Sequence, residues 1–127
     1  MKSSWRQIRA LDPDANYVVL ASSIPARRWR STLAMFRGSR AVADQLERTE
    51  GVVGFAMLAE PVRKRYATLS VWTGEPAIRA FAASTPHREL MAALADQMAD
   101  TRFEQWSILG ADGCPTWPDA LARLETH

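Results

Sequence analysis

Hydrophobic positions along this chain of 127 residues follow two periods, one typical of strands and one typical of helices. Stretches rich in β-branched and aromatic residues, bounded by turn-forming or polar residues, predict strands over 16–24, 52–60, 65–73 and 101–109. Apolar residues at helical spacing predict helices over 28–49, 76–83, 86–99 and 116–125. The predicted order is therefore β-α-β-β-α-β, followed by a helical C-terminal tail at 115–126.

This order is that of the ferredoxin-like fold, in which a four-stranded antiparallel sheet carries its helices on one face. We therefore expect an α+β protein with a single domain over 1–127 and a core unit at 16–109. The alternation over 52–60 places Val53, Phe55, Met57 and Ala59 on one face, and Val52, Ala56 and Leu58 on the other with Gly54 between them. Because the helices cover only one face, we expect a second copy to cover the other, which makes a homodimer through the sheet face.

The composition agrees with one globular domain and argues against nucleic acid or a membrane as a partner. The chain is 47% hydrophobic and 24% charged, and both values are ordinary for a globular protein. A net charge of +2 is too mild to predict a nucleic-acid surface, so the arginines at 27–30 are expected to be solvated. No apolar run approaches the roughly 20 residues of a membrane span, and the first residues lack a signal-peptide core. We expect a cytoplasmic protein with no nucleic-acid or membrane partner.

Few residues are available for thiol or metal chemistry. The single cysteine, Cys114, allows no disulfide within the chain. The two histidines, His87 and His127, leave a four-ligand zinc site dependent on carboxylates, which suits a structural zinc ion poorly. We therefore expect no metal site.

The third predicted strand carries the first candidate binding residues. Its alternation places on one face Tyr66, Thr68, Ser70 and Trp72. Aromatic surface with a few hydroxyl groups suits a flat, mostly apolar ligand that is oriented by a small number of polar contacts. The alternative is that the two aromatic residues belong to the core and that the hydroxyl groups are solvated or capped.

His87 is the candidate base. If a helix begins at Pro86, the imidazole lies in its first turn, where the positive end of the helix dipole favours the neutral form. A neutral imidazole can accept a proton or bind a metal ion. Such a base could take a proton from a phenol or an anthrone-like compound and leave a carbanion that reduces dioxygen without a cofactor. The alternative is a histidine that only bonds to a loop carbonyl.

Several of these residues together resemble a known family. They are Glu50-Gly51-Val52-Val53-Gly54-Phe55, Thr68-Leu69-Ser70-Val71-Trp72, Glu75, Ala80-Phe81, Ser84, Pro86-His87 and Met91. The pattern is similar to the antibiotic-biosynthesis-monooxygenase-like family of the dimeric α+β barrel superfamily. Within it, the chain most resembles the branch with uncharacterised monooxygenase-like domains and spheroidene monooxygenase. The resemblance covers residues 16–109.

The resemblance implies a dimeric α+β barrel and an oxidoreductase of secondary metabolism. The implied reaction is monooxygenation of a small hydrophobic aromatic or polyketide-like compound without a cofactor, with His87 and Trp72 as catalytic residues. Substrate-binding residues would be Tyr66, Thr68, Ser70, Phe81 and Met91.

Two alternatives stay open beside this reading. Haem-degrading members of the superfamily carry a tryptophan and a haem-ligating histidine where this chain has Phe81 and Met91, so that reaction is not expected. Spheroidene-type enzymes are haem-dependent, so a haem-binding oxygenase with His87 as axial ligand is one alternative. The other is a non-catalytic dimer that binds a small ligand.

Overall fold

One antiparallel sheet of five strands organises the computed structural model, which describes residues 5–25, 40–60, 65–84, 87–88 and 101–125. The strands are β1 (Arg6–Gln7), β2 (Asn16–Pro25), β3 (Val52–Glu60), β4 (Arg65–Trp72) and β5 (Arg102–Leu109). They lie side by side in the order β1-β3-β4-β2-β5. The four predicted strands agree with β2 to β5 within one residue at each end. The two-residue β1 was not predicted, because so short a strand leaves no periodic signal.

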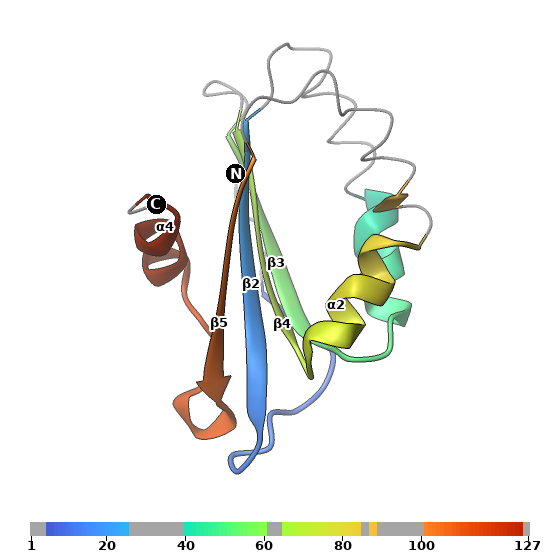
Figure 1. Cartoon of the computed structure of the whole chain (residues 1–127), viewed down its shortest axis with the longest axis vertical. Helices are drawn as coiled ribbons and strands as arrows, with labels where there is room; N and C mark the ends of the chain where they lie inside the picture. Colours follow the sequence, from blue (N-terminus) through green and yellow to red (C-terminus); the bar gives the residue numbers. More distant parts are fainter. Residues whose placement is uncertain (1–4, 26–39, 61–64, 85–86, 89–100, 126–127) are drawn as a thin grey trace.

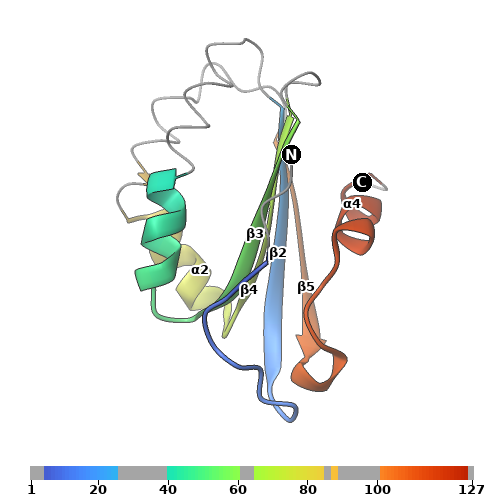
Figure 2. The ribbon, with the colours of Figure 1, turned by 180° about the vertical axis from the view of Figure 1, so that it is seen from behind.

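Helices lie on both faces of this sheet. The helical residues 40–48 and α2 (Glu75–Ala82) cover one face, whereas α4 (Trp117–Glu125) lies against the other (Figures 1 and 2). A short 3₁₀ turn, η1 (Gly110–Asp112), joins β5 to the segment before α4. The predicted helical residues 28–39, 86 and 89–99 lie outside the described residues. The predicted α+β, ferredoxin-like class is confirmed. None of the helices in the described ranges is long and apolar enough to cross a membrane.

A β-bulge in β3 changes which residues share a face. Val52 lies opposite Trp72 of β4, but Gly54 lies opposite Val71, so the register shifts by one residue between them. Val52 therefore packs in the same cluster as Phe55, and Val53 packs on the opposite face. The predicted assignment of Val52 and Val53 is wrong, because a bulge adds one residue and reverses the alternation that precedes it.

The face opposite α2 carries its own hydrophobic core. Its buried members are Tyr17, Val19, Ala21, Val53, Leu69, Val71, Ala120 and Leu124. The last two belong to α4, and Trp5 packs against the same cluster. Trp5 crosses β3 so closely that a Cβ atom at Gly54 would lie 2.6 Å from its Cζ2 atom. Within the described residues, α4 and Trp5 therefore pack against this face, which corrects the premise that nothing in the chain itself could do so, while the homodimer through the sheet face stays a prediction.

We expect the packing of α4 to be sensitive to the size of residue 120. Ala120 is fully buried, whereas Ala122 on the same helix is exposed. Ala120→Leu adds methyl groups to a filled site and is expected to lower the free energy of unfolding by about 1–3 kcal/mol. The control Ala122→Leu should change it by less than about 0.5 kcal/mol. Urea denaturation measures both, and equal values would contradict the packing of α4 on the sheet.

Candidate functional site

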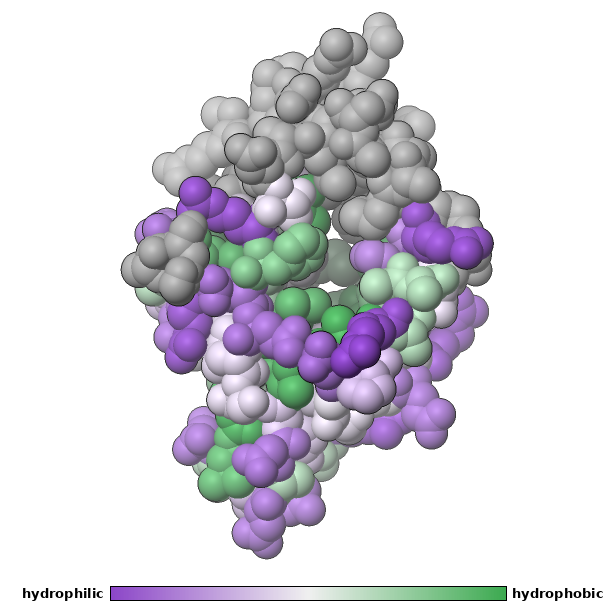
Figure 3. Space-filling view, in the orientation of Figure 1, coloured by the Kyte–Doolittle hydropathy of each residue, from purple (hydrophilic) through white to green (hydrophobic). Residues whose placement is uncertain are grey.

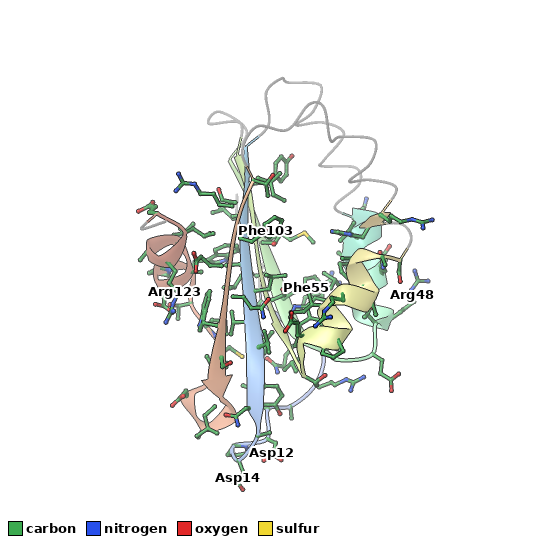
Figure 4. The ribbon with its side chains drawn as sticks, viewed as in Figure 1. Asp12, Asp14, Arg48, Phe55, Phe103 and Arg123 are labelled. Carbon is green, nitrogen blue, oxygen red and sulfur yellow. The ribbon has the colours of Figure 1, made fainter. Side chains whose placement is uncertain are left out.

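A cavity of about 570 Å³ lies between the sheet and the helices on the α2 side. Figure 3 shows hydrophobic residues around a hollow in the middle of the molecule, and Figure 4 shows Phe55 between the sheet and α2. The lining residues with side chains on this face of the sheet are Leu20, Ser22, Ile24, Phe55, Met57, Tyr66, Thr68, Ser70, Trp72, Phe103 and Gln105. The helical side contributes Val42, Leu46, Ile78, Phe81, Ala82 and His87. These described lining residues include no aspartate, glutamate, lysine or arginine, and His87 is the one histidine among them.

The register of the strands arranges the floor of the cavity in rows. Ser70 lies between Phe55 of β3 and Leu20 of β2, and the row continues to Gln105 of β5. The next row places Thr68 between Met57 and Ser22, and it ends at Phe103. The hydroxyl-bearing residues of β4 therefore have neighbours on both sides, and one of those neighbours, Ser22, was missed in the sequence.

The structure brings the predicted site residues to one place. Tyr66, Thr68, Ser70, Trp72, Phe81 and His87 all line this cavity, and Met91 lies outside the described residues. Tyr66 and Trp72 are also buried, with 5% and 1% of their surface exposed. They thus belong to the core and border the cavity at the same time, because the cavity adjoins the core.

Three aromatic rings form one side of the cavity. The ring centroids of Trp72 and Phe81 are 5.5 Å apart, and those of Phe81 and His87 are 4.9 Å apart, both in tilted arrangements that are favourable for aromatic pairs. The indole Nε1 of Trp72 donates a hydrogen bond to Oγ of Ser70 at 2.7 Å. Since the indole has a single polar hydrogen, Trp72 offers a ligand aromatic surface and no hydrogen bond.

A contact with a backbone carbonyl favours one tautomer of the His87 imidazole. Its Nδ1 lies 3.4 Å from the carbonyl oxygen of Ala82, at the end of α2. A carbonyl oxygen only accepts, so the proton of the neutral ring sits on Nδ1 and the lone pair on Nε2 is left for another partner. Burial lowers the pKa of His87, and the bond to Ala82 offsets part of this change. Burial thus favours the neutral form, which was predicted from the sequence on the basis of a helix dipole. The predicted start of that helix at Pro86 lies outside the described residues.

The side chain of Gln45 connects the backbone of Phe81 to that of His87, two of the three aromatic residues at the cavity. Its Oε1 accepts a hydrogen bond from the backbone N of His87 at 3.0 Å, and its Nε2 donates to the carbonyl oxygen of Phe81 at 3.4 Å. Thr49 donates to the carbonyl oxygen of Gln45 at 2.6 Å. Gln45 is 7% exposed, between the apolar Val42 and Leu46. A glutamine on the apolar stripe of a predicted helix was the sequence signal, and it was missed.

The lowered pKa of His87 predicts how protonation affects the protein. The folded state binds this proton more weakly than the unfolded chain, so the contribution to stability is present above pH 6.5 and is lost as the pH falls through the lowered pKa. We expect the NMR signal of the His87 Hε1 proton to titrate with a midpoint below pH 6.5, measured in His127→Gln to remove the second histidine. A midpoint above that value would contradict the burial of the ring.

Among the residues that the structure describes, no three histidine, cysteine or carboxylate side chains gather closely enough to hold a metal ion.

Comparison with known proteins gives the same picture for the fold. The sequence matches no protein-family model and no curated protein. A provisionally named monooxygenase from Fusobacterium nucleatum superposes on 83% of this chain with a TM-score of 0.71 and 8% identity, and the chain spans about half (48%) of that protein.

Two shorter proteins match over most of their own length. SnoaB, a cofactor-independent oxygenase from Streptomyces nogalater, has a TM-score of 0.61 and 18% identity, covering 82% of this chain and 99% of its own. A provisionally named antibiotic biosynthesis monooxygenase from Deinococcus radiodurans has a TM-score of 0.60 and 10% identity, covering 70% and 89%. The resemblance found in the sequence is confirmed for the fold: this chain has the α+β ferredoxin-like fold of the antibiotic biosynthesis monooxygenases.

Proposed function

We propose that this protein is a monooxygenase that oxidises a small, uncharged aromatic or polyketide-like compound without a resident cofactor. The observation that carries the proposal is the imidazole of His87, whose pKa is lowered by burial, at the aromatic side of a large apolar cavity. SnoaB shares the fold and is a cofactor-independent oxygenase, which supports this reaction class. Fold alone does not fix chemistry, so the proposal stands on the site.

The reaction needs one base and an enclosed, apolar space. The Nε2 atom of His87 takes a proton from an activated CH₂ group or a phenol of the substrate, and the resulting carbanion passes one electron to dioxygen. The two radicals combine to a peroxide anion, which takes the proton back from the imidazolium of His87, and the resulting hydroperoxide loses water to leave the carbonyl group. A CH₂ group and O₂ thus become a carbonyl group and H₂O, and no outside reductant is consumed.

The lining of the cavity favours an uncharged substrate. Burying an unpaired charge in an apolar site costs several kcal/mol. The described lining has no arginine, lysine or carboxylate to compensate a charge on the ligand. Trp72 and Phe81 would contact the faces or edges of its rings. The proposed binding residues also include Tyr66, Thr68 and Ser70. Met91, which lies outside the described residues, is proposed as a further one.

Oxygen uptake with an anthrone as probe tests the proposal. In protein shown to be metal-free and colourless, we expect uptake above that of a heat-denatured sample, with one atom of ¹⁸O₂ in the product carbonyl and the other in water. Uptake that appears only after a metal or haem is added would contradict the absence of a cofactor. Binding of the probe without uptake would favour the alternative of a non-catalytic ligand-binding protein.

The structure gives limited support to the haem alternative. His87 could offer Nε2 to an iron atom, but haem also brings two carboxylates, and no basic side chain is among the described lining residues. These residues therefore fit haem poorly. We expect titration with haemin to give no Soret band that depends on His87, and a band that is lost in His87→Ala would reverse this conclusion.

We also propose that the protein is a homodimer, on grounds other than the sheet face. Phe103 on the edge strand β5 is 64% exposed and borders the cavity, and Figure 4 shows it beside β5. A large apolar side chain on an exposed edge strand favours contact with another chain. We expect sedimentation velocity to show a dimer that dissociates in Phe103→Lys and persists in the control Ala111→Lys. A wild-type monomer at micromolar concentration would contradict the dimer.

A further inference from the structure

The hydroxyl groups of the cavity floor differ in what they still offer to a ligand. We infer that Ser70 selects a hydrogen-bond donor on the substrate, whereas the pair Ser22–Thr68 selects an acceptor, so that the preferred ligand carries a hydroxyl group at one end and a carbonyl group at the other. The inference rests on the proposed function only in taking this cavity as the substrate site.

Ser70 has already used its only hydrogen. Its Oγ donates to the carbonyl oxygen of Leu20 at 3.3 Å, because that oxygen can only accept. The same Oγ accepts the Nε1 hydrogen of Trp72 at 2.7 Å. A hydroxyl group has one hydrogen and two lone pairs, so a single lone pair is left. Ser70 therefore binds a donor such as a phenol and is repelled by a carbonyl or phenolate oxygen.

The pair Ser22–Thr68 has one hydrogen to spare. The two side chains face each other across β2 and β4, and their oxygens form one short hydrogen bond. That bond uses one of the two hydroxyl hydrogens, whichever residue donates it. The structure gives these hydroxyl groups no other partner in the described part of the chain. The second hydrogen is therefore left for a ligand acceptor.

Ser70 and the pair Ser22–Thr68 are far enough apart to bind different functional groups of one ligand. Thr68 and Ser70 are two residues apart on β4, which separates them by about 7 Å along the strand. Ser22 is 3% exposed and Ser70 is 6% exposed, so few water molecules compete for them. A buried polar group that loses its partner costs about 1–3 kcal/mol, and a site of this kind rejects ligands that lack the matching group. The cavity thus favours a hydroxyaryl ketone over its ethers and hydrocarbons.

Three ligands of one size test this selectivity: 4-hydroxybenzophenone, 4-methoxybenzophenone and 4-hydroxydiphenylmethane. The second lacks the hydrogen-bond donor, and the third lacks the carbonyl acceptor. Binding is measured by calorimetry under nitrogen, where no turnover takes place. We expect the wild-type protein to bind the first compound about tenfold more tightly than either of the others.

Variants assign each preference to its residues. Ser70→Ala should remove the preference for hydroxyl over methoxyl and keep that for carbonyl over CH₂. The double variant Ser22→Ala, Thr68→Val should do the reverse, while Thr68→Val alone leaves the hydrogen of Ser22 and keeps both preferences. Ser23→Ala, on the opposite face of β2, is the matched control and should change neither. Because Ser70→Ala leaves the indole N–H unpaired, the same change is also compared within a Trp72→Phe background.

Several results would overturn the inference. These are equal affinities of the wild-type protein for the three probes, no binding of any of them, and a hydroxyl preference that survives Ser70→Ala in both backgrounds. Failure of the proposed function is a separate result. Selective binding without oxygen uptake from an anthrone would refute the oxygenase and leave the hydrogen-bonding selectivity in place.

Discussion

Replacing His87 with alanine is expected to lower the rate of oxygen uptake by about 100-fold or more, the usual contribution of a general base. The neutral ring keeps its hydrogen on Nδ1, bonded to Ala82, and presents the lone pair of Nε2 as the proton acceptor. Alanine removes that acceptor. The rate is measured with an oxygen electrode on an anthrone, over pH values on both sides of 6.5, and the wild-type rate should fall toward acid pH as the imidazole is protonated.

Two controls separate the loss of a base from the loss of a packed ring. His87→Gln keeps a polar side chain of similar size and has no basic nitrogen, so its rate should fall as far as that of alanine while the affinity for 4-hydroxybenzophenone is kept. His127→Ala removes the other histidine and should leave the rate unchanged. An undiminished rate in His87→Gln would remove this residue from the reaction.

Replacing Gln45 with leucine is expected to affect both stability and rate. Leucine has a similar size, but it leaves the backbone N–H of His87 without its partner, while the carbonyl of Phe81 keeps only the bond from the backbone N of Ser84. The loss should lower the free energy of unfolding by about 2 kcal/mol. It should also lower kcat by about tenfold or more, because small displacements of a catalytic group are costly. Urea denaturation and oxygen uptake measure the two effects.

Gln45→Glu distinguishes positioning of the imidazole from simple stabilisation. The carboxylate still accepts from the N–H of His87 but no longer donates to Phe81, and its negative charge raises the pKa of the imidazole. Among the described residues, the groups that contact His87 are otherwise uncharged. The acid limb of the rate profile should therefore move to higher pH. Asp44→Leu, at an exposed position of the same helix, should change neither the pH–rate profile nor the maximal rate. If the acid limb of Gln45→Glu stays at the wild-type pH, the contact between residues 45 and 87 is contradicted.

The sequence was informative where one local pattern sufficed. The alternation over 65–73 placed four side chains on one face of β4, and all four line the cavity. It was misleading at Val52 and Val53, because the bulge lies in the pairing of β3 with β4 and leaves no mark on the hydrophobic pattern of β3 alone. A strict alternation was the simplest reading of that stretch.

Other parts of the site depend on contacts that no local pattern contains. The role of Gln45 needs two backbone groups about forty residues away, which only tertiary structure brings together. The covering of the second face by α4 was missed, because a nine-residue helix with exposed charges has a weak apolar signal. The pKa of His87 is lowered, which favours the neutral form, and the cause among the described residues is burial rather than a helix dipole.

The two-sided core has a consequence for how this protein can change. The sheet separates a half that α4 and Trp5 seal from a half that encloses the cavity, and the side chains of the two halves belong to alternate positions of the same strands. Distant substitutions that share no partner generally contribute independently to stability. Because α4 contributes no residue to the cavity lining, we expect that changes in this helix can raise thermostability while changes on the other side of the sheet alter the range of accepted compounds.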